Sequence, residues 1–211
     1  MAIRLITAPS VEPVALDLAK SHLRVDHSYD DLLIAAYIEG ARLFAEKFCG
    51  RALVTQTWEL VLDEFPRDSL RSSTLPLGPF IDVPLPPLQS VTSIKYDDAA
   101  GVEQTLATNA YTVDTVSEPG RVAPVTSWPS GVISRIGAVR VRFVAGYSPS
   151  TDSPPDLAAN VPESIKNAIL LHTGMLYAQR ESNVIATIVN QVPAGGILHL
   201  LRQYRVALGM A

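Results

Sequence analysis

The sequence predicts an α+β protein in which both chain ends form a helical core and an antiparallel β barrel or sandwich is inserted between them. Three observations support this. Apolar residues recur every three or four positions from about residue 29 to 49, the period changes to two after Gly50, and helical spacing returns after residue 161. We therefore expect a helical core from residues 1–54 and 155–211, and a β domain from residues 55–154.

Two helices are expected before Gly50. Pro13 followed by residues 14–23 predicts a short helix, because proline is tolerated in the first turn. In the long helix that follows, Glu39, Arg42 and Glu46 define a polar face, and Gly50 supplies a helix stop. The apolar face opposite this polar face is expected to consist of Leu33, Tyr37, Ala41, Phe44 and Phe48.

The middle of the chain reads as short strands joined by turns. Residues 55–63 alternate in polarity, residues 91–106 predict a hairpin, and residues 110–123 predict a second hairpin that turns at Glu118-Pro119-Gly120. Residues 139–147 alternate cleanly, and this spacing of strands is typical of a barrel or sandwich. Residues 66–88 contain six prolines and predict a long loop, which in a compact domain is usually functional or disordered.

The chain is expected to return to helix near its C-terminal end. Pro162 opens a helix over residues 162–181 that is apolar on more than one face, as in a buried or shared helix. A last short helix is expected from Ile197 to about Leu208. Its apolar stripe consists of Ile197, Leu200, Leu201 and Tyr204.

Charge argues against a nucleic-acid reader. The 211 residues carry a formal net charge of -4 and show no clustered basic stripe. Residues 182–211 contain two basic residues, Arg202 and Arg205, and no acidic ones, whereas residues 1–181 hold 15 basic and 21 acidic residues. The basic, apolar tail suggests docking onto another molecule, although chance explains such a window equally well.

The remaining composition suggests a protein made in a reducing cytoplasm. Cys49 is the single cysteine, so an intramolecular disulfide is impossible. Residues 1–13 lack the blocks of a signal peptide, and no apolar run approaches the ~20 residues that span a bilayer.

Motifs of catalysis are absent from the sequence. It contains no Gly-x-Ser-x-Gly elbow, no phosphate-binding loop and no His-Glu-x-x-His helix. His22, Asp26 and His27 could form a metal cluster, but a helix end and a solvated turn is the favoured interpretation. We therefore expect no catalytic, cofactor-binding or metal-binding residues, and no enzyme.

Several ordered segments carry a family likeness. Residues 18–26, 30–34 and 50–58 resemble the phage head-tail connector family, in particular its longer members with a β insertion found in prophages and gene transfer agents. The likeness spans roughly residues 10–205, but residues 67–80 have no counterpart, and Gln203 stands where the family often has proline. It continues through residues 85–91, 111–114, 118–121, 127–129, 141–147, 161–169 and 177–181.

The resemblance implies a non-enzymatic structural protein of the virion neck, made in the host bacterial cytoplasm. Family members form a ring, usually of twelve copies, below the portal of a tailed bacteriophage or phage-like particle. They extend the DNA channel, and genome DNA passes through the lumen without sequence-specific binding. Their partners are the portal protein on one side, and the stopper and tail-side neck proteins on the other.

The last helix is the hypothesised portal-binding segment, and packing of this helix on its own subunit is the alternative. Other virion ring components, namely a stopper or tail-completion protein, also fit the sequence. A small hydrolase or a carbohydrate-binding module is a further alternative. The hypothesised portal-binding residues are Ile197, Leu200, Leu201, Tyr204 and Arg205.

Overall fold

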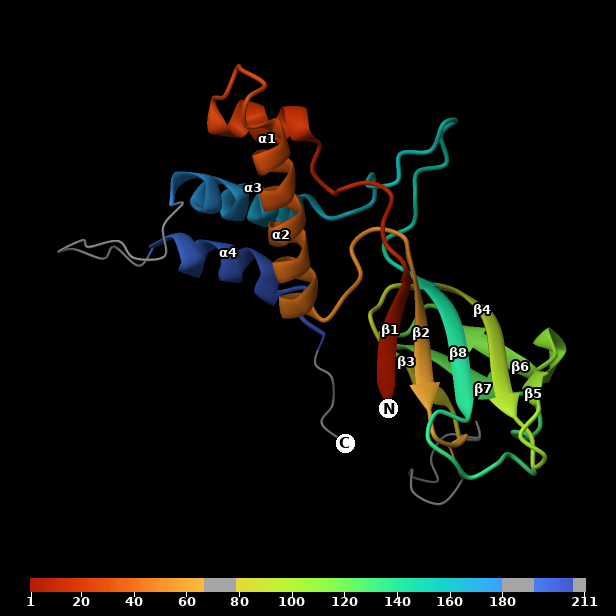
Figure 1. The fold of residues 1–211 in the computed structure, drawn as a ribbon. Coiled ribbons are helices and arrows are strands. Elements are labelled where there is room, and N and C mark those ends of the chain that lie inside the picture. The colour runs from red at the N-terminus through yellow and green to blue at the C-terminus, as the bar shows by residue number, and fades with distance from the viewer. Residues whose placement is uncertain (67–78, 180–191, 207–211) are drawn as a thin grey trace. The chain divides into compact units, whose positions relative to one another are not determined.

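The computed structural model describes residues 1–66, 79–179 and 192–206, and it divides into two compact units. One unit, here the β unit, comprises Met1–Pro9 and Thr55–Gly146. The other, here the helical unit, comprises Ser10–Val54 and Tyr147–Ala211. Figure 1 shows the described α-helices in the helical unit and the described strands in the β unit, which confirms the predicted mixed architecture.

The described strands of the β unit form two antiparallel sheets. A five-stranded sheet has the order β1-β2-β8-β4-β5, and a three-stranded sheet has the order β3-β7-β6. Among the described residues neither sheet closes into a barrel, so the barrel alternative is wrong, because each sheet keeps two unpaired edge strands. The strands are β1 (Ala2–Thr7), β2 (Gln56–Leu62), β3 (Ile81–Val83), β4 (Leu88–Asp97), β5 (Glu103–Thr105), β6 (Tyr111–Asp114), β7 (Gly120–Pro124) and β8 (Val139–Ala145).

The two predicted hairpins are confirmed, and in β8 the alternation of side chains between the two faces decides which residues are buried. β4 pairs with β5, and β6 pairs with β7 through the turn at Glu118-Pro119-Gly120. In β8, Val139, Val141 and Phe143 are buried, and the intervening arginines lie on the other face. Gly120 is required where β7 meets β4, because a Cβ there would lie 2.6 Å from a Leu88 methyl carbon.

The first residues of the chain were expected in the helical core, and this part of the prediction is wrong. Residues 2–7 form β1, which pairs antiparallel with β2 at the edge of the larger sheet. Arg4 lies opposite Glu59 in this pairing, and their side chains form a 2.5 Å ion pair. The six residues do not alternate between apolar and polar and all of them are exposed, so their sequence carries no local strand signal.

The predicted 66–88 loop is partly strand. Ile81–Val83 forms β3, which pairs with β7, and Leu88 begins β4. Residues 67–78 of the predicted loop lie outside the described residues. β3 was not expected because the residues around it are rich in proline. A three-residue edge strand is nevertheless compatible with nearby prolines, since it needs few free backbone N–H groups.

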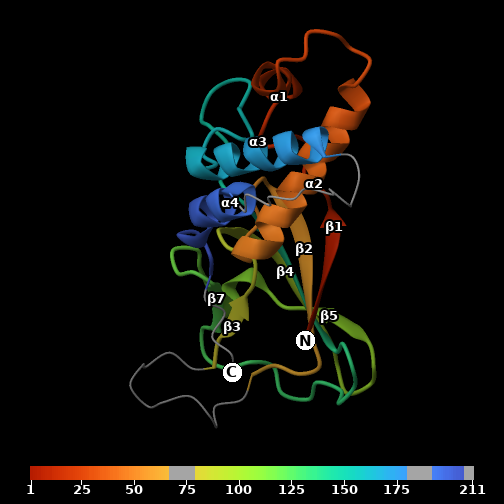
Figure 2. The same cartoon turned by 90° about the vertical axis from the view of Figure 1, so that its left-hand side faces the viewer.

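Four helices are described in the helical unit, and they pack around one core. The helices are α1 (Leu16–Leu23), α2 (Asp31–Cys49), α3 (Glu163–Ala178) and α4 (Val192–Arg202). α2 contacts the other three, and α3 also packs along α4, as Figure 2 shows. Ile34 and Ile38 from α2 meet Ile165 and Ile169 from α3 in this core. Burial of these apolar side chains, which come from distant parts of the sequence, is the main source of stability of the unit.

α2 buries a different face from the one predicted. The buried side is formed by Ile34, Ile38, Ala41, Ala45 and Cys49 together with Arg42. Phe44 is exposed, and Leu33, Tyr37 and Phe48 are only half-buried. The assignment of Arg42 to a polar outer face was therefore wrong. Its guanidinium is buried because Glu12 and Glu46 each accept a hydrogen bond from it at 2.8 Å.

A buried carboxylate braces the β unit. Asp97, at the end of β4, is 2% exposed and accepts hydrogen bonds from Arg140 at 2.6 Å and from Arg135. Arg140 also reaches Glu103 at 3.0 Å, so the charge network joins β4, β5 and β8. The hydrogen bonds from Arg140, with those from Arg135, lower the pKa of Asp97 to about 2.

We predict that Asp97→Asn lowers the free energy of unfolding of the β unit by about 1–3 kcal/mol at pH 7, because charged partners lose a buried acceptor. The folded-state pKa of Asp97 is about 2, below an unfolded value of about 4. Its contribution is therefore complete above about pH 4 and is lost as the pH falls toward 2.

Urea titration followed by tryptophan fluorescence measures this effect, because both tryptophans, Trp58 and Trp128, lie in the β unit. Asp97→Asn should weaken the pH dependence, and Asp152→Asn, which changes an exposed aspartate, is the control. Superimposable pH profiles for Asp97→Asn and the unmodified protein would contradict the assignment.

Candidate functional site

The candidate site is the C-terminal end of the described chain, where α4 leads into residues 203–206. α4 spans Val192–Arg202, so it begins five residues before the predicted start and ends before the predicted Leu208. The last two residues of the predicted helix, 207 and 208, lie outside the described residues. The observed end at Arg202 places Tyr204 and Arg205 just after the helix.

The five hypothesised portal-binding residues divide into two groups. Ile197 and Leu201 are buried in the core of the helical unit, beside Cys49 of α2. Leu200 and Tyr204 are half-buried against the same core, and Arg205 is exposed. The buried residues of the apolar stripe therefore hold α4 on its own subunit. The half-buried residues of the stripe, together with Arg205, form a margin that remains accessible.

Residues 204–206 are fixed to the C-terminal end of α2 by hydrogen bonds. The Arg51 Nε–H donates to the Tyr204 carbonyl at 2.5 Å, and the Val206 N–H donates to the Cys49 carbonyl at 2.8 Å. The Arg205 guanidinium lies 5.7 Å from the centre of the Phe48 ring. These contacts hold Arg205 in a defined position at the surface.

Gly50 permits this arrangement. Its φ of +67° ends α2 in the left-handed conformation, where a side chain is disfavoured. Its N–H donates to the Glu46 carbonyl at 2.8 Å. The sequence identified Gly50 as a helix stop, but no local signal shows that residues 204–206, about 150 positions later, attach there.

The chemistry of Cys49 fits a structural role. Its side chain is fully buried, and its thiol donates to the Leu201 carbonyl at a distance of 3.6 Å. Burial raises the pKa of the Cys49 thiol to about 11. The thiolate that nucleophilic chemistry requires is therefore scarce at neutral pH.

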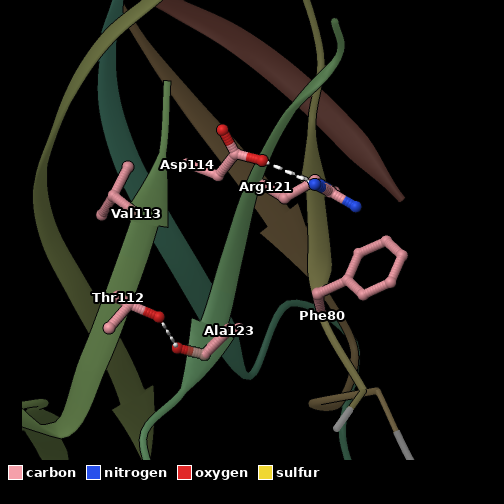
Figure 3. A pocket seen from close by; sticks show the side chains of 6 residues that line it. All are labelled: Phe80, Thr112, Val113, Asp114, Arg121 and Ala123. Atoms are coloured by element: carbon pink, nitrogen blue, oxygen red, sulfur yellow. Dashed lines mark hydrogen bonds and ion pairs between the residues drawn. The ribbon is translucent and has the colours of Figure 1, made fainter. Parts of the chain in front are cut away.

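The hollow in Figure 3 lies in the β unit, on one face of the β6–β7 hairpin. Its volume is about 160 Å³, below the ~300–1,000 Å³ of typical ligand pockets. Its charged residues neutralise each other, since Arg121 and Asp114 form a 2.6 Å ion pair. The hydroxyl of Ser117, with Arg121, lowers the pKa of Asp114. This carboxylate therefore closes the hairpin turn and has no sign of an acid–base role.

A second hollow of about 460 Å³ adjoins Pro66 and Pro79 in the β unit. Trp128 lines it, stacks on Phe65 with ring centres 4.8 Å apart, and donates its indole N–H to the Pro79 carbonyl at 2.7 Å. Glu64 is the single carboxylate among the described lining residues. A glycoside hydrolase needs a pair of carboxylates, so this hollow gives no support to the hydrolase alternative.

Candidate metal ligands are not brought together in the described part of the chain. No group of three or more His, Cys, Asp or Glu side chains is arranged to hold a metal ion there, and the favoured interpretation of His22, Asp26 and His27 needs none. Likewise, no helix in the described ranges has the length and apolar character needed to cross a membrane.

Comparison with known proteins agrees with the resemblance found in the sequence. Residues 14–76 match the family model described as "Phage gp6-like head-tail connector protein". This match covers α1, α2 and the first strand after them. No curated protein sequence matches this chain.

Solved structures of gene transfer agent (GTA) particles share the fold over nearly the whole chain. A chain from the neck of an empty GTA particle, computed with C6 symmetry, matches with a TM-score of 0.72 at 18% identity, covering 98% of this chain and 96% of that one. Matches to the virion of a native GTA particle and to its neck computed with C12 symmetry have TM-scores of 0.71 and 0.65, each at 19% identity with the same coverage. The predicted resemblance to the phage head-tail connector family is confirmed.

We predict that Leu201→Ala lowers the free energy of unfolding of the helical unit by about 2–5 kcal/mol, because it removes buried methyl groups and leaves a cavity. Arg205→Ala should change it by about 0.5 kcal/mol or less, because the side chain is exposed. Urea titration followed by circular dichroism at 222 nm measures both. Equal losses for the two variants would contradict the division of these residues into buried and accessible groups.

Proposed function

We propose that this protein is a structural head-tail connector in the neck of a tailed bacteriophage or phage-like particle. The observation that carries the proposal is the likeness to GTA neck chains over 98% of this chain, with the connector family match at residues 14–76 as independent support. The role requires no catalysis. Copies of the chain form a ring through which genome DNA passes without sequence-specific binding.

The ring proposal rests on symmetry and charge. Two of the similar chains come from necks computed with C6 and C12 symmetry, which supports a closed ring and agrees with twelve copies. A net charge of -4 disfavours adhesion of DNA to the channel wall, since phosphate binding requires concentrated positive charge. In this proposal the helical core supplies the contacts that form the ring.

Portal binding is assigned to the accessible margin of α4 and the residues that follow it. Leu200, Tyr204 and Arg205 contact the portal, with Arg202 adding positive charge, while Ile197 and Leu201 hold the helix in place. The fixed position of Arg205 over Phe48 supports this assignment, because a pre-ordered cation loses less entropy on binding. The stopper and tail-side neck proteins bind elsewhere on the ring.

The direct test is an averaged density map of whole particles from the virus that encodes this chain. The proposal expects a ring of this chain between the portal and the tail, with the copy number read from the map. A position on the tail side of the ring next to the portal would assign it as a stopper or tail-completion protein. Absence from the particle would overturn the proposal.

The portal contact is tested by reversing its charge. Arg202→Glu with Arg205→Glu should weaken co-sedimentation with purified portal at least tenfold, because two exposed cations become anions. Arg24→Glu, at an exposed cation after α1, is the matched control and should bind as the unmodified chain does. Unchanged binding of the double variant would sink the assignment to this segment.

A further inference from the structure

α2 exposes apolar residues on the side that faces away from the core of its own unit. Residues spaced three or four apart share a helix face. Opposite the buried Ile34 and Ile38, this spacing places Leu32, Ala36, Gly40, Leu43 and Lys47, all of them exposed. Leu32 is 89% exposed and Leu43 is 52% exposed. We call Leu32, Ala36, Gly40 and Leu43 the outer α2 face.

The outer α2 face reverses the usual pattern of a surface helix. The side of a helix that faces away from its core is normally charged or polar. Here the charged neighbours lie at the margins, with Lys47 at the C-terminal end and Glu39 beside Gly40. Phe44, which is 40% exposed, extends the apolar surface toward His172 of α3. The Phe44 and His172 rings pack edge to face with their centres 4.6 Å apart. Contiguous exposed apolar surface of this kind marks an interaction site.

Gly40 adds a second observation. It lies in the middle of the 19-residue helix, where glycine is less stable than alanine. A Cβ built on Gly40 would have no atom within 4 Å apart from its chain neighbours and the adjacent backbone of α2, so packing inside the subunit does not require glycine. A bare backbone at this position allows another backbone to approach α2 closely.

We propose that the outer α2 face binds the helical unit of the neighbouring copy in the ring. This inference rests on the proposed function and names the surface through which copies meet. The occupant is a second copy because the similar GTA chains come from necks computed with C6 and C12 symmetry, where each subunit repeats the same contact. Rings are built from heterologous contacts, so the neighbour presents a different surface to this face.

Charge and placement agree with this occupant. Each chain carries a net charge of -4. The four residues of the outer α2 face are uncharged and Glu39 lies at their margin, so the apolar centre of the contact brings no anion toward the like-charged neighbour. α4 packs into the core of the unit through Ile197 and Leu201, whose partners on α2 lie on its buried side. The outer α2 face is therefore distinct from the α4 margin assigned to the portal.

Photo-crosslinking in assembled particles identifies the occupant. A benzophenone amino acid at position 43 should yield an adduct of two 22.7 kDa chains, identified by mass spectrometry. The matched control is position 136, since Ile136 is 92% exposed and lies in the β unit. Adducts only to a different protein, no adduct at all, or equal yields of the two-chain adduct from both positions would overturn the proposal.

Gly40→Leu separates a binding role from a structural one. Leucine has the higher helix propensity and the site is open, so the melting temperature of the isolated chain should rise by about 2–4 °C. Incorporation into the particle neck should nevertheless fall at least tenfold, because the side chain blocks close approach of the neighbour. A structural role alone would move both measurements in the same direction.

Failure of this inference is distinguishable from failure of the proposed function. If the unmodified chain is missing from the neck, the proposed function is wrong. If the unmodified chain forms the ring and Gly40→Leu enters it normally, the connector role stands and the outer α2 face is not the contact.

Discussion

The buried guanidinium of Arg42 fixes the helix on which the helical unit depends. It is 4% exposed and is held by Glu12 from the segment before α1 and by Glu46 one turn along α2. A buried cation without partners is strongly destabilising. Because Glu12 lies outside α2, the helix cannot rotate without losing the hydrogen bond from Arg42 to Glu12. In this fixed orientation of α2, Ile34 and Ile38 face α3. The same orientation also leaves the outer α2 face exposed, which gives the proposed ring contact a defined direction.

The C-terminal end of α2 is connected both to the residues that lead to the β unit and to the residues that follow α4. At its C-terminal end, Gly50 directs the chain to the β unit, and the backbone of residues 204–206 is bound there through Cys49 and Arg51. The segment assigned to the portal is therefore attached to the helix assigned to the ring. A displacement of α2 on ring closure would be passed to Arg205 through these bonds.

Local periodicity predicted the elements, whereas tertiary partners decided the faces. The strands of the two hairpins and the extents of α2 and α3 follow from spacing and turn residues. The rotation of α2 does not, because the helix is apolar on most sides and Arg42 reads as a surface residue until Glu12 is placed beside it. The stripe of α4 was equally ambiguous, since Ile197 and Leu201 have the spacing expected both for a core and for a docking face. β1 could not be predicted, because its six residues do not alternate in polarity and only pairing with β2 defines them as a strand.

The way the chain divides between the units ties assembly to the completion of synthesis. α2 ends at Cys49, but α3 begins at Glu163 and α4 ends at Arg202, so the partners that cover its inner side emerge more than a hundred residues later. Contacts of such long sequence separation form late and leave apolar surface open in the meantime. A nascent or prematurely terminated chain thus has an α2 that is apolar on both sides and lacks the core that orients it. Only a chain that includes α3 and α4 presents the proposed subunit contact on a folded core, which would exclude incomplete copies from the proposed ring.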